Sequence, residues 1–294
     1  MKARPLLWWF AFTSVLQAAD VLTLRNVDQS GSPPPQQEAR MFLTSICPGN
    51  VVPNPRGFMS CLNCPEFTAF KGETFSWDLS AIYKGHFTDP KADEAAVAMR
   101  GCEPHSLRFG GTALFARAGN EWKFKWYQAN VITDDCVLVR KRKGQDMLVC
   151  ADADGTQGAE FYTLSAIDLD AEPESREKEL LRIFDNTPSC GIDYSGGTDT
   201  IFPLQKAVFR RISFDADKSR LQAEVLYGWR PYSSEDAKKC HEADSRHEPI
   251  PKSLQPRTEL FLINFVFDGD KFELTPESEI GKRIVESRPT SNRR

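Results

Sequence analysis

Four of the eight cysteines of this chain lie close together in sequence and could carry chemistry. Cys61 and Cys64 form a Cys-x-x-Cys motif inside "FMSCLNCPEF", with Cys47 before them and Cys102 after them. A thiol-exchange site of this kind needs its first cysteine at a helix N-terminus, where the thiolate is stabilised. Here the flanking residues are rich in proline and typical of turns, which disfavours thiol exchange.

Zinc binding is a second possibility for the same cysteines. The stretch "GCEPH" adds Cys102 and His105, so three thiolates and one imidazole could complete a closed tetrahedral site together with Cys61 and Cys64. The third possibility is two structural disulfides, which we favour because an oxidising compartment removes free thiols. The connectivity stays open between 47–61 with 64–102 and 47–64 with 61–102.

The stretch "CVLVRKRKGQDMLVC" predicts a hairpin and one disulfide from spacing alone. A three-residue loop at residues 142–144, with Gly144 in the left-handed conformation, places Cys136 opposite Cys150 and Arg140 opposite Asp146. Three apolar pairs lie between these two. Because a slip of one residue would break every match, the spacing predicts a Cys136–Cys150 disulfide.

The remaining two cysteines are predicted to pair through a helix. Residues 233–247, "SSEDAKKCHEADSRH", begin with the Ser233 and Asp236 spacing of a capping box. Ala237, Cys240 and Ala243 recur every three residues and therefore share one face of the helix. Cys240 should point inward, with Cys190 as its expected partner.

The N-terminal residues indicate export. Lys2 and Arg4 precede an apolar run from Pro5 to Leu16 and then small residues before Asp20, the pattern of a secretory signal peptide over residues 1–19. The run is too short to span a membrane, and no transmembrane segment is expected later. Residues 20–40 are expected to be a flexible lead-in and residues 281–294 a disordered tail. The protein should be periplasmic or extracellular.

Runs of β-type residues between turn signals predict a mainly antiparallel fold. Hairpins are expected at 111–130, 207–229 and 258–278, with turns at 118–120, 215–219 and 268–270. Residues 91–99 suit a helical turn or a strand, and residues 173–184 begin like a helix and end like a strand. The expected architecture is one all-β domain over residues 41–280 with one or two short helices, either an irregular β-propeller or a two-sheet β-sandwich.

The stretch "YKGHFTDPKADEAAVAM" resembles a blade of the FG-GAP or VCBS type of β-propeller, with weaker echoes in "KGQDMLVCADADG" and "ISFDADKSRLQAEVLYG". The chain also resembles uncharacterised exported bacterial proteins with "GCEPH" and "FGGT"-like stretches. The blade resemblance implies calcium binding by oxygen atoms in "CADADGTQGAE". A plain Asp-Gly turn is the alternative. The calcium ligands that this resemblance implies are Asp152, Asp154, Thr156 and Glu160.

Catalytic motifs are not visible in the sequence, and no cofactor is expected apart from the calcium that the resemblance implies. No Gly-x-Ser-x-Gly elbow occurs, and the net charge of −4 with scattered basic residues argues against nucleic acid binding. Trp122, Phe124 and Trp126 alternate along one predicted strand, as core residues or as a carbohydrate platform. We expect an exported, non-catalytic β domain that binds a protein or a glycan at the cell envelope. The alternative is an exported hydrolase with catalytic residues dispersed in sequence.

Overall fold

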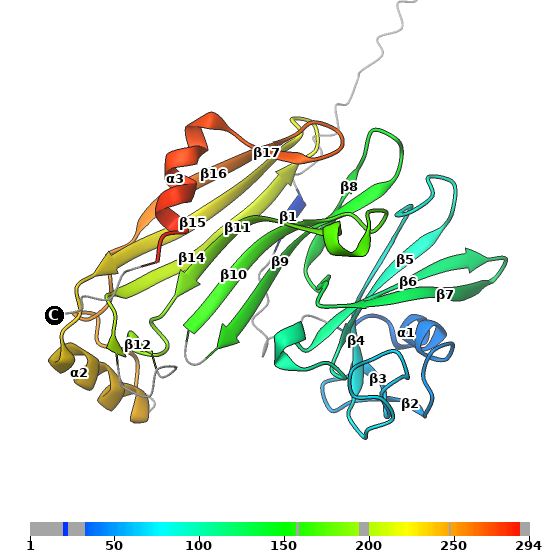
Figure 1. The fold of residues 1–294 in the computed structure, drawn as a ribbon, viewed down its shortest axis with the longest axis horizontal. Helices are drawn as coiled ribbons and strands as arrows, with labels where there is room; N and C mark the ends of the chain where they lie inside the picture. Colours follow the sequence, from blue (N-terminus) through cyan, green and yellow to red (C-terminus); the bar gives the residue numbers. More distant parts are fainter. Residues whose placement is uncertain (1–19, 23–32, 157–158, 194–199, 247, 289–294) are drawn as a thin grey trace, which may run out of the picture.

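The computed structural model of the protein describes residues 20–22, 33–156, 159–193, 200–246 and 248–288. This part of the chain is mostly antiparallel β structure with three short α-helices (Figure 1). Its strands form a six-stranded, a four-stranded and a five-stranded sheet, with a separate two-stranded ribbon. The all-β prediction is therefore confirmed.

The six-stranded sheet contains β2 to β7 in chain order. Its strands are β2 (Val51–Pro53), β3 (Met59–Cys61), β4 (Trp77–Gly85), β5 (Glu94–Arg100), β6 (Gly110–Ala118) and β7 (Glu121–Ala129). The four-stranded sheet has the order β11-β10-β9-β8. Its strands are β8 (Cys136–Arg140), β9 (Asp146–Thr156), β10 (Ala159–Ile167) and β11 (Glu177–Asp185).

The five-stranded sheet has the order β1-β14-β15-β16-β17. Its strands are β1 (Asp20–Leu22), β14 (Leu204–Asp215), β15 (Arg220–Arg230), β16 (Glu259–Phe267) and β17 (Phe272–Leu274). The ribbon pairs β12 (Ile192–Asp193) with β13 (Thr200–Ile201). The helices are α1 (Gln36–Leu43), α2 (Ser234–Ser245) and α3 (Glu279–Val285), and short 3₁₀ turns occur at His105–Leu107, Pro173–Ser175 and Pro276–Ser278.

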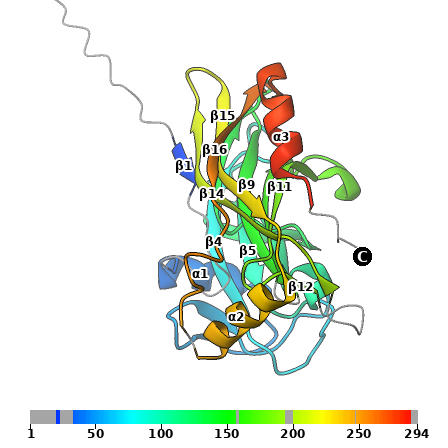
Figure 2. The ribbon, with the colours of Figure 1, turned by 90° about the vertical axis from the view of Figure 1, so that its left-hand side faces the viewer.

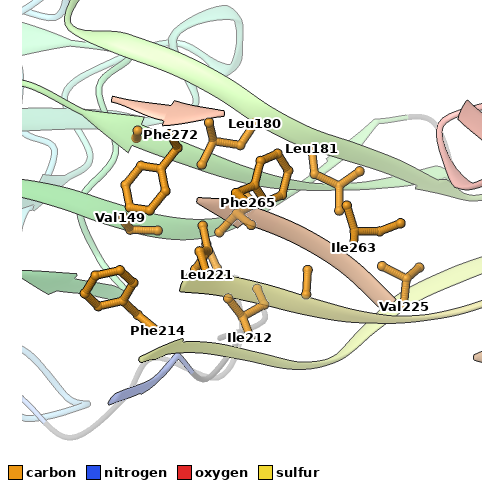
Figure 3. Packing of buried hydrophobic residues seen from close by; sticks show 14 of the residues in the cluster. Val149, Leu180, Leu181, Ile212, Phe214, Leu221, Val225, Ile263, Phe265 and Phe272 are labelled. Carbon is orange, nitrogen blue, oxygen red and sulfur yellow. The ribbon is translucent and has the colours of Figure 1, made fainter. Parts of the chain in front are cut away.

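The largest core lies between the four-stranded and the five-stranded sheet. Leu221, Val225 and Phe265 of the five-stranded sheet face Val149 and Leu181 of the four-stranded sheet (Figure 3). Strands alternate the direction of their side chains, so every second residue of these strands enters this core. Two sheets packed in this way form a β-sandwich.

The other face of the four-stranded sheet packs against the six-stranded sheet. Leu148 and Ile167 meet Ala96, Leu114 and Phe87 there. The far face of the six-stranded sheet is covered by α1, whose buried Ala39, Phe42 and Leu43 recur at helical spacing. The sheets thus stack as layers (Figure 1) rather than radiating as propeller blades. The fold is therefore sandwich-like, but it has three packed sheets where the predicted alternative had two.

The five-stranded sheet is closed at its margins by short helices. Figure 2 views the molecule from the β14–β16 side and shows α3 along one margin of this sheet and α2 near its end. Lys282 of α3 donates to the Leu180 carbonyl at 2.6 Å, and Val285 is fully buried in the large core. In this way α3 joins β16 to β11 across the open side of the sandwich.

The predicted hairpins have the predicted turns. Strand β6 ends at Ala118, β14 at Asp215 and β16 at Phe267, and each is followed by its partner after the expected turn. Cys136 faces Cys150 and Arg140 faces Asp146 in the register that the spacing predicts, with Gly144 at a positive φ. Residues 94–100 form a strand, not a helix, and residues 177–185 are a strand after a 3₁₀ turn.

Both ends of the predicted domain need correction. The lead-in predicted to be flexible contains β1 and the start of α1, whose Ala39 is buried. The tail predicted to be disordered contains most of α3, because Val285 finds a place in the sandwich core. The helix expected at 233–247 is α2, and Ser233 and Asp236 form its capping box. The predicted signal peptide and residues 289–294 lie outside the described residues.

All eight cysteines are paired in four disulfides. The pairs are Cys47–Cys61, Cys64–Cys102, Cys136–Cys150 and Cys190–Cys240. The structure thus has the two pairs predicted individually and one of the two connectivities left open. Four disulfides are typical of an exported protein. In the described residues, no helix is long and apolar enough to cross a membrane.

Candidate functional site

A hollow that could hold a ligand lies where the β8–β9 hairpin meets the six-stranded sheet. We call it the interlayer groove, and its volume is about 720 Å³. Apolar, cationic and anionic residues from six strands, α1 and two turns line it. The lining residues are Met41, Lys84, Gly85, His86, Asp93, Glu94, Arg117, Asn120, Trp122, Leu138, Arg140 and Asp146.

Two hydrogen bonds between His86 and Asp146 hold the two sides of the groove together. The His86 amide donates to Asp146 Oδ2 at 2.8 Å, and the Asp146 amide donates to the His86 carbonyl at 2.7 Å. Asp146 is buried, and its Oδ1 also contacts Arg140 Nε at 2.7 Å. Gly85 is needed beside this carboxylate, because a Cβ atom there would lie 2.7 Å from Asp146 Oδ2.

The turn between β4 and β5 forms one end of the groove and is internally bonded. Buried Glu94 accepts hydrogen bonds from the Thr88 amide at 2.6 Å and from the Thr88 hydroxyl. His86 Nδ1 lies 2.7 Å from the Ala92 carbonyl. A carbonyl can only accept, so Nδ1 carries the proton and donates. These bonds keep the acid and the imidazole fixed as parts of a rigid wall.

Trp122 supplies the aromatic side chain of the groove. Its ring packs against buried Phe42 of α1, with 5.2 Å between ring centroids. Trp122, Phe124 and Trp126 all pack against core clusters, as the core alternative predicts, but they do not share one face, because the β6–β7 register shifts between Leu114 and Phe115. Trp122 and Phe124 pack on the α1 side, whereas Trp126 packs on the side of the four-stranded sheet, with Arg176 above its ring.

The alternative zinc site does not form. Cys61, Cys64 and Cys102 are divided between two disulfides, so no thiolate is left to bind a metal. His105 instead lies with Nε2 at 3.2 Å from Asp154 Oδ1 and at 3.1 Å from the Gly155 carbonyl. In the described part of the chain, no group of three or more histidine, cysteine or acidic residues could hold a metal ion.

The residues implied as calcium ligands do not converge. Asp152 and Asp154 lie on β9, and Thr156 is the last residue of that strand, so they follow a hairpin strand and not an ion-binding loop. Glu160 pairs with Gly155, one residue out of phase with Asp154, so its side chain leaves the opposite face of the sheet. There it accepts a hydrogen bond from the Tyr162 hydroxyl. The calcium expectation from the blade resemblance is therefore corrected.

Asp152 belongs instead to a network of arginines and acids. Its carboxylate lies 3.2 Å from Arg100 Nη2 and 3.4 Å from Arg108 Nη1. Arg100 also contacts Asp134, and Arg108 also contacts Glu177. Burial raises the pKa of Asp152, and the two guanidinium groups oppose that rise.

A second hollow of about 330 Å³ opens beside this network, at the other end of the junction between the six-stranded and four-stranded sheets. We call it the acidic hollow. Residues of β9, β10 and β11 in the four-stranded sheet form one side of it, and Arg108 and Asn130 beside the six-stranded sheet form the other. It is lined by Arg108, Asn130, Asp152, Asp154, Phe161, Thr163, Glu177, Glu179 and Arg182.

Sequence reasoning found few of the residues that line these hollows. Arg108 and Phe109 both have φ near 52°, a left-handed conformation that is uncommon outside glycine and often marks functional positions. No single-residue signal in "HSLRFGG" predicts it. His86 and Asp146 meet across 60 residues of sequence, and only the packing of two sheets brings them together.

Comparisons with known proteins give no further guide. No protein-family model, no curated protein and no solved structure matches this chain.

Proposed function

We propose that the protein is an exported, non-catalytic β domain that binds a neutral glycan at the cell envelope, in the periplasm or outside the cell. The interlayer groove is the proposed binding site. The observation that carries this proposal is the groove itself, which combines Trp122 and Leu138 with charged groups of both signs. Its volume lies within the range of about 300 to 1,000 Å³ typical of ligand sites.

Charges of both signs favour an uncharged ligand with many hydroxyl groups. Arg117 and Arg140 can only donate hydrogen bonds, whereas Asp93 can only accept them when ionised. A hydroxyl group does both, so a sugar can bond to every one of these side chains. A ligand whose charges are all of one sign would instead lie close to groove side chains of the same sign, which repel it. The apolar face of a sugar ring also suits the flat indole of Trp122.

The predicted alternatives were a protein ligand and a hydrolase. A hydrolytic site would need a nucleophile or acid pair free to act on a substrate. The buried acids of the groove already have partners within the protein. Glu94 accepts hydrogen bonds from Thr88, and Asp146 accepts one from the His86 amide and pairs with Arg140. This arrangement favours binding over turnover. A peptide ligand is a separate outcome that the same experiment can detect.

Calorimetric titration with neutral oligosaccharides tests the proposal. The probes are cellohexaose, chitohexaose and maltohexaose, with a hexaalanine peptide as the protein-like probe. We expect binding of at least one of the sugars and a loss of about tenfold in affinity, or 1.4 kcal/mol, in Trp122→Ala. Arg117→Ala, at an exposed position in the same groove, should also weaken binding.

Trp229→Ala is the matched control, because Trp229 is 56% exposed on β15 and does not line the groove. Its affinity should equal that of the wild type. Equal losses in Trp122→Ala and Trp229→Ala, or binding of the peptide alone, would contradict the glycan proposal. Chromatography of the samples after the titration detects cleavage of a sugar. Cleavage products would establish the hydrolase instead.

A further inference from the structure

The acidic hollow carries an excess of negative charge that its own arginines do not balance. Five carboxylates line it or lie in the adjoining network, against the guanidinium groups of Arg100, Arg108, Arg182 and Arg288. The carboxylates are those of Asp134, Asp152, Asp154, Glu177 and Glu179. A partly enclosed hollow with one sign in excess concentrates the field and attracts the opposite charge.

The inner acids of the hollow are already bonded, whereas the outer acids remain accessible. Arg108 bridges Asp152 and Glu177, and Ser165 donates to Glu177 at 2.9 Å. Glu179 is exposed, and its carboxylate lies 3.8 Å from the guanidinium group of Arg182. Because both side chains are exposed, this ion pair contributes little to stability. Asp154 meets exposed His105. A new cation would therefore encounter Asp154 and Glu179 first.

An aromatic pair beside these acids already holds guanidinium groups. Phe161 lines the hollow and packs against Phe184, with 5.1 Å between ring centroids. Arg182 lies 4.7 Å from the Phe161 centroid, and Arg288 lies 5.0 Å from Phe161 and 5.5 Å from Phe184. Cations bind over aromatic faces in this range of distance. This surface is thus suited to arginine or lysine side chains.

Arg288 differs from the other arginines of this region in how it is held. Arg100 and Arg108 are anchored by carboxylates, whereas Arg288 contacts two phenylalanine rings among the described residues. Its side chain is exposed, near the end of the described chain. An exposed cation–π contact is weak, so a competing cation can replace it.

We propose that the acidic hollow binds a basic side chain, lysine or arginine, from a cationic polypeptide segment, and that Arg288 is the internal group that this side chain displaces. The incoming ammonium or guanidinium group would lie over Phe161 between Asp154 and Glu179. Charge complementarity selects this partner, and the site is separate from the interlayer groove. Its occupant is therefore independent of the proposed glycan.

Fluorescence anisotropy with fluorescein-labelled hexaarginine and hexalysine tests this site on the full-length mature protein. We expect binding that weakens as salt is added, because the contact is between charged groups. Phe161→Leu should weaken binding at least fivefold. Asp154→Asn, at a half-exposed position, should weaken it at least threefold and serves as the second variant if Phe161→Leu does not fold.

Arg288→Ala should tighten binding at least threefold, because it removes the competing cation. Arg283→Ala is the matched control: Arg283 is an exposed arginine on α3, and its loss changes the net charge equally. Equal tightening in both variants would show that general electrostatics, not displacement, governs binding and would overturn the proposal. Absence of binding, or no effect of either Phe161→Leu or Asp154→Asn, would do the same. Trp122→Ala should leave peptide binding unchanged.

Discussion

His86 and Asp146 exchange two hydrogen bonds, at 2.8 and 2.7 Å, and so join the six-stranded sheet to the four-stranded sheet. The Asp146 carboxylate accepts one of them and also contacts Arg140. Asp146→Ala leaves the half-buried His86 amide without that acceptor and frees Arg140. Removing one partner of a buried hydrogen bond costs about 1 to 3 kcal/mol. We expect a loss of this size in the free energy of unfolding, measured by urea titration under non-reducing conditions.

The control for this variant is Asp217→Ala, at an exposed position in the turn between β14 and β15. It should change the free energy of unfolding by less than about 0.5 kcal/mol. Asp146→Ala should also weaken glycan binding, because Asp146 holds one wall of the interlayer groove. A wild-type urea midpoint in Asp146→Ala would contradict the role given to this contact.

The disulfide connectivity gives a second prediction. Peptide mapping by mass spectrometry of non-reduced protein should recover four linked pairs, including Cys47–Cys61 and Cys64–Cys102. Recovery of a Cys47–Cys64 pair, or of alkylated Cys136 and Cys150 without reduction, would contradict it. The double variant Cys136→Ala with Cys150→Ala should lose about 3 kcal/mol of stability, the amount expected for a loop of this length.

Local patterns predicted much of the fold. The β8–β9 register follows from cross-strand pairs such as Arg140 with Asp146, and the start of α2 follows from Ser233 and Asp236, because these interactions are decided within a few residues. The same reasoning failed for Trp126, because a register shift in the β6–β7 pair turned it to the other face. A bulge of this kind depends on packing of both sheet faces, which a strand's own sequence does not show.

The candidate sites were much harder to predict. The blade resemblance implied that Asp152 binds calcium, but its actual partners are Arg100 and Arg108, which come from two other segments. Ion pairs between layers depend on the stacking of sheets, and no sequence period encodes that stacking. The tail was misjudged for a related reason: Val285 has a buried place only because the sandwich leaves a margin open between β11 and β16.

The buried acid Glu103 predicts a pH dependence of stability. Burial raises the pKa of Glu103, and a weak hydrogen bond from the Ala69 amide at 3.4 Å opposes the rise. The folded protein therefore binds this proton more tightly than the unfolded chain, so stability falls as pH rises through the raised pKa. Glutamine does not titrate. The free energy of unfolding of Glu103→Gln relative to the wild type should increase between about pH 4 and about pH 7.

Urea titrations at both pH values measure this change, and Asp215→Asn provides a comparison of opposite sign. The hydrogen bond from Lys218 lowers the pKa of Asp215, so stability from this group is lost as pH falls through the lowered pKa. Asp215→Asn should therefore lose stability relative to the wild type as pH rises from about pH 2 to about pH 4, so its titrations are made at those two pH values. A relative stability of Glu103→Gln that is the same at both pH values would contradict the buried-acid interpretation.

The last prediction concerns two glycines on strands, which differ in the space available for a Cβ atom. A Cβ atom at Gly111 on β6 would lie 2.2 Å from the Gln128 carbonyl oxygen of neighbouring β7. Among the described residues, a Cβ atom at Gly155 on β9 would meet nothing closer than the Ala159 carbonyl oxygen at 3.8 Å. Since backbone cannot move aside as a flexible side chain can, Gly111→Ala must push β6 and β7 apart. We expect it to lose about 1 to 3 kcal/mol of stability.

Gly155→Ala is the matched substitution and should keep or slightly raise the stability, because it removes backbone freedom from the unfolded chain without a clash. Thermal unfolding of the two variants side by side measures the difference. The strand β7 also carries Trp122, so Gly111→Ala should weaken glycan binding while Gly155→Ala leaves it unchanged. Equal stability of the two variants would show that β6 and β7 do not lie as close as this register requires.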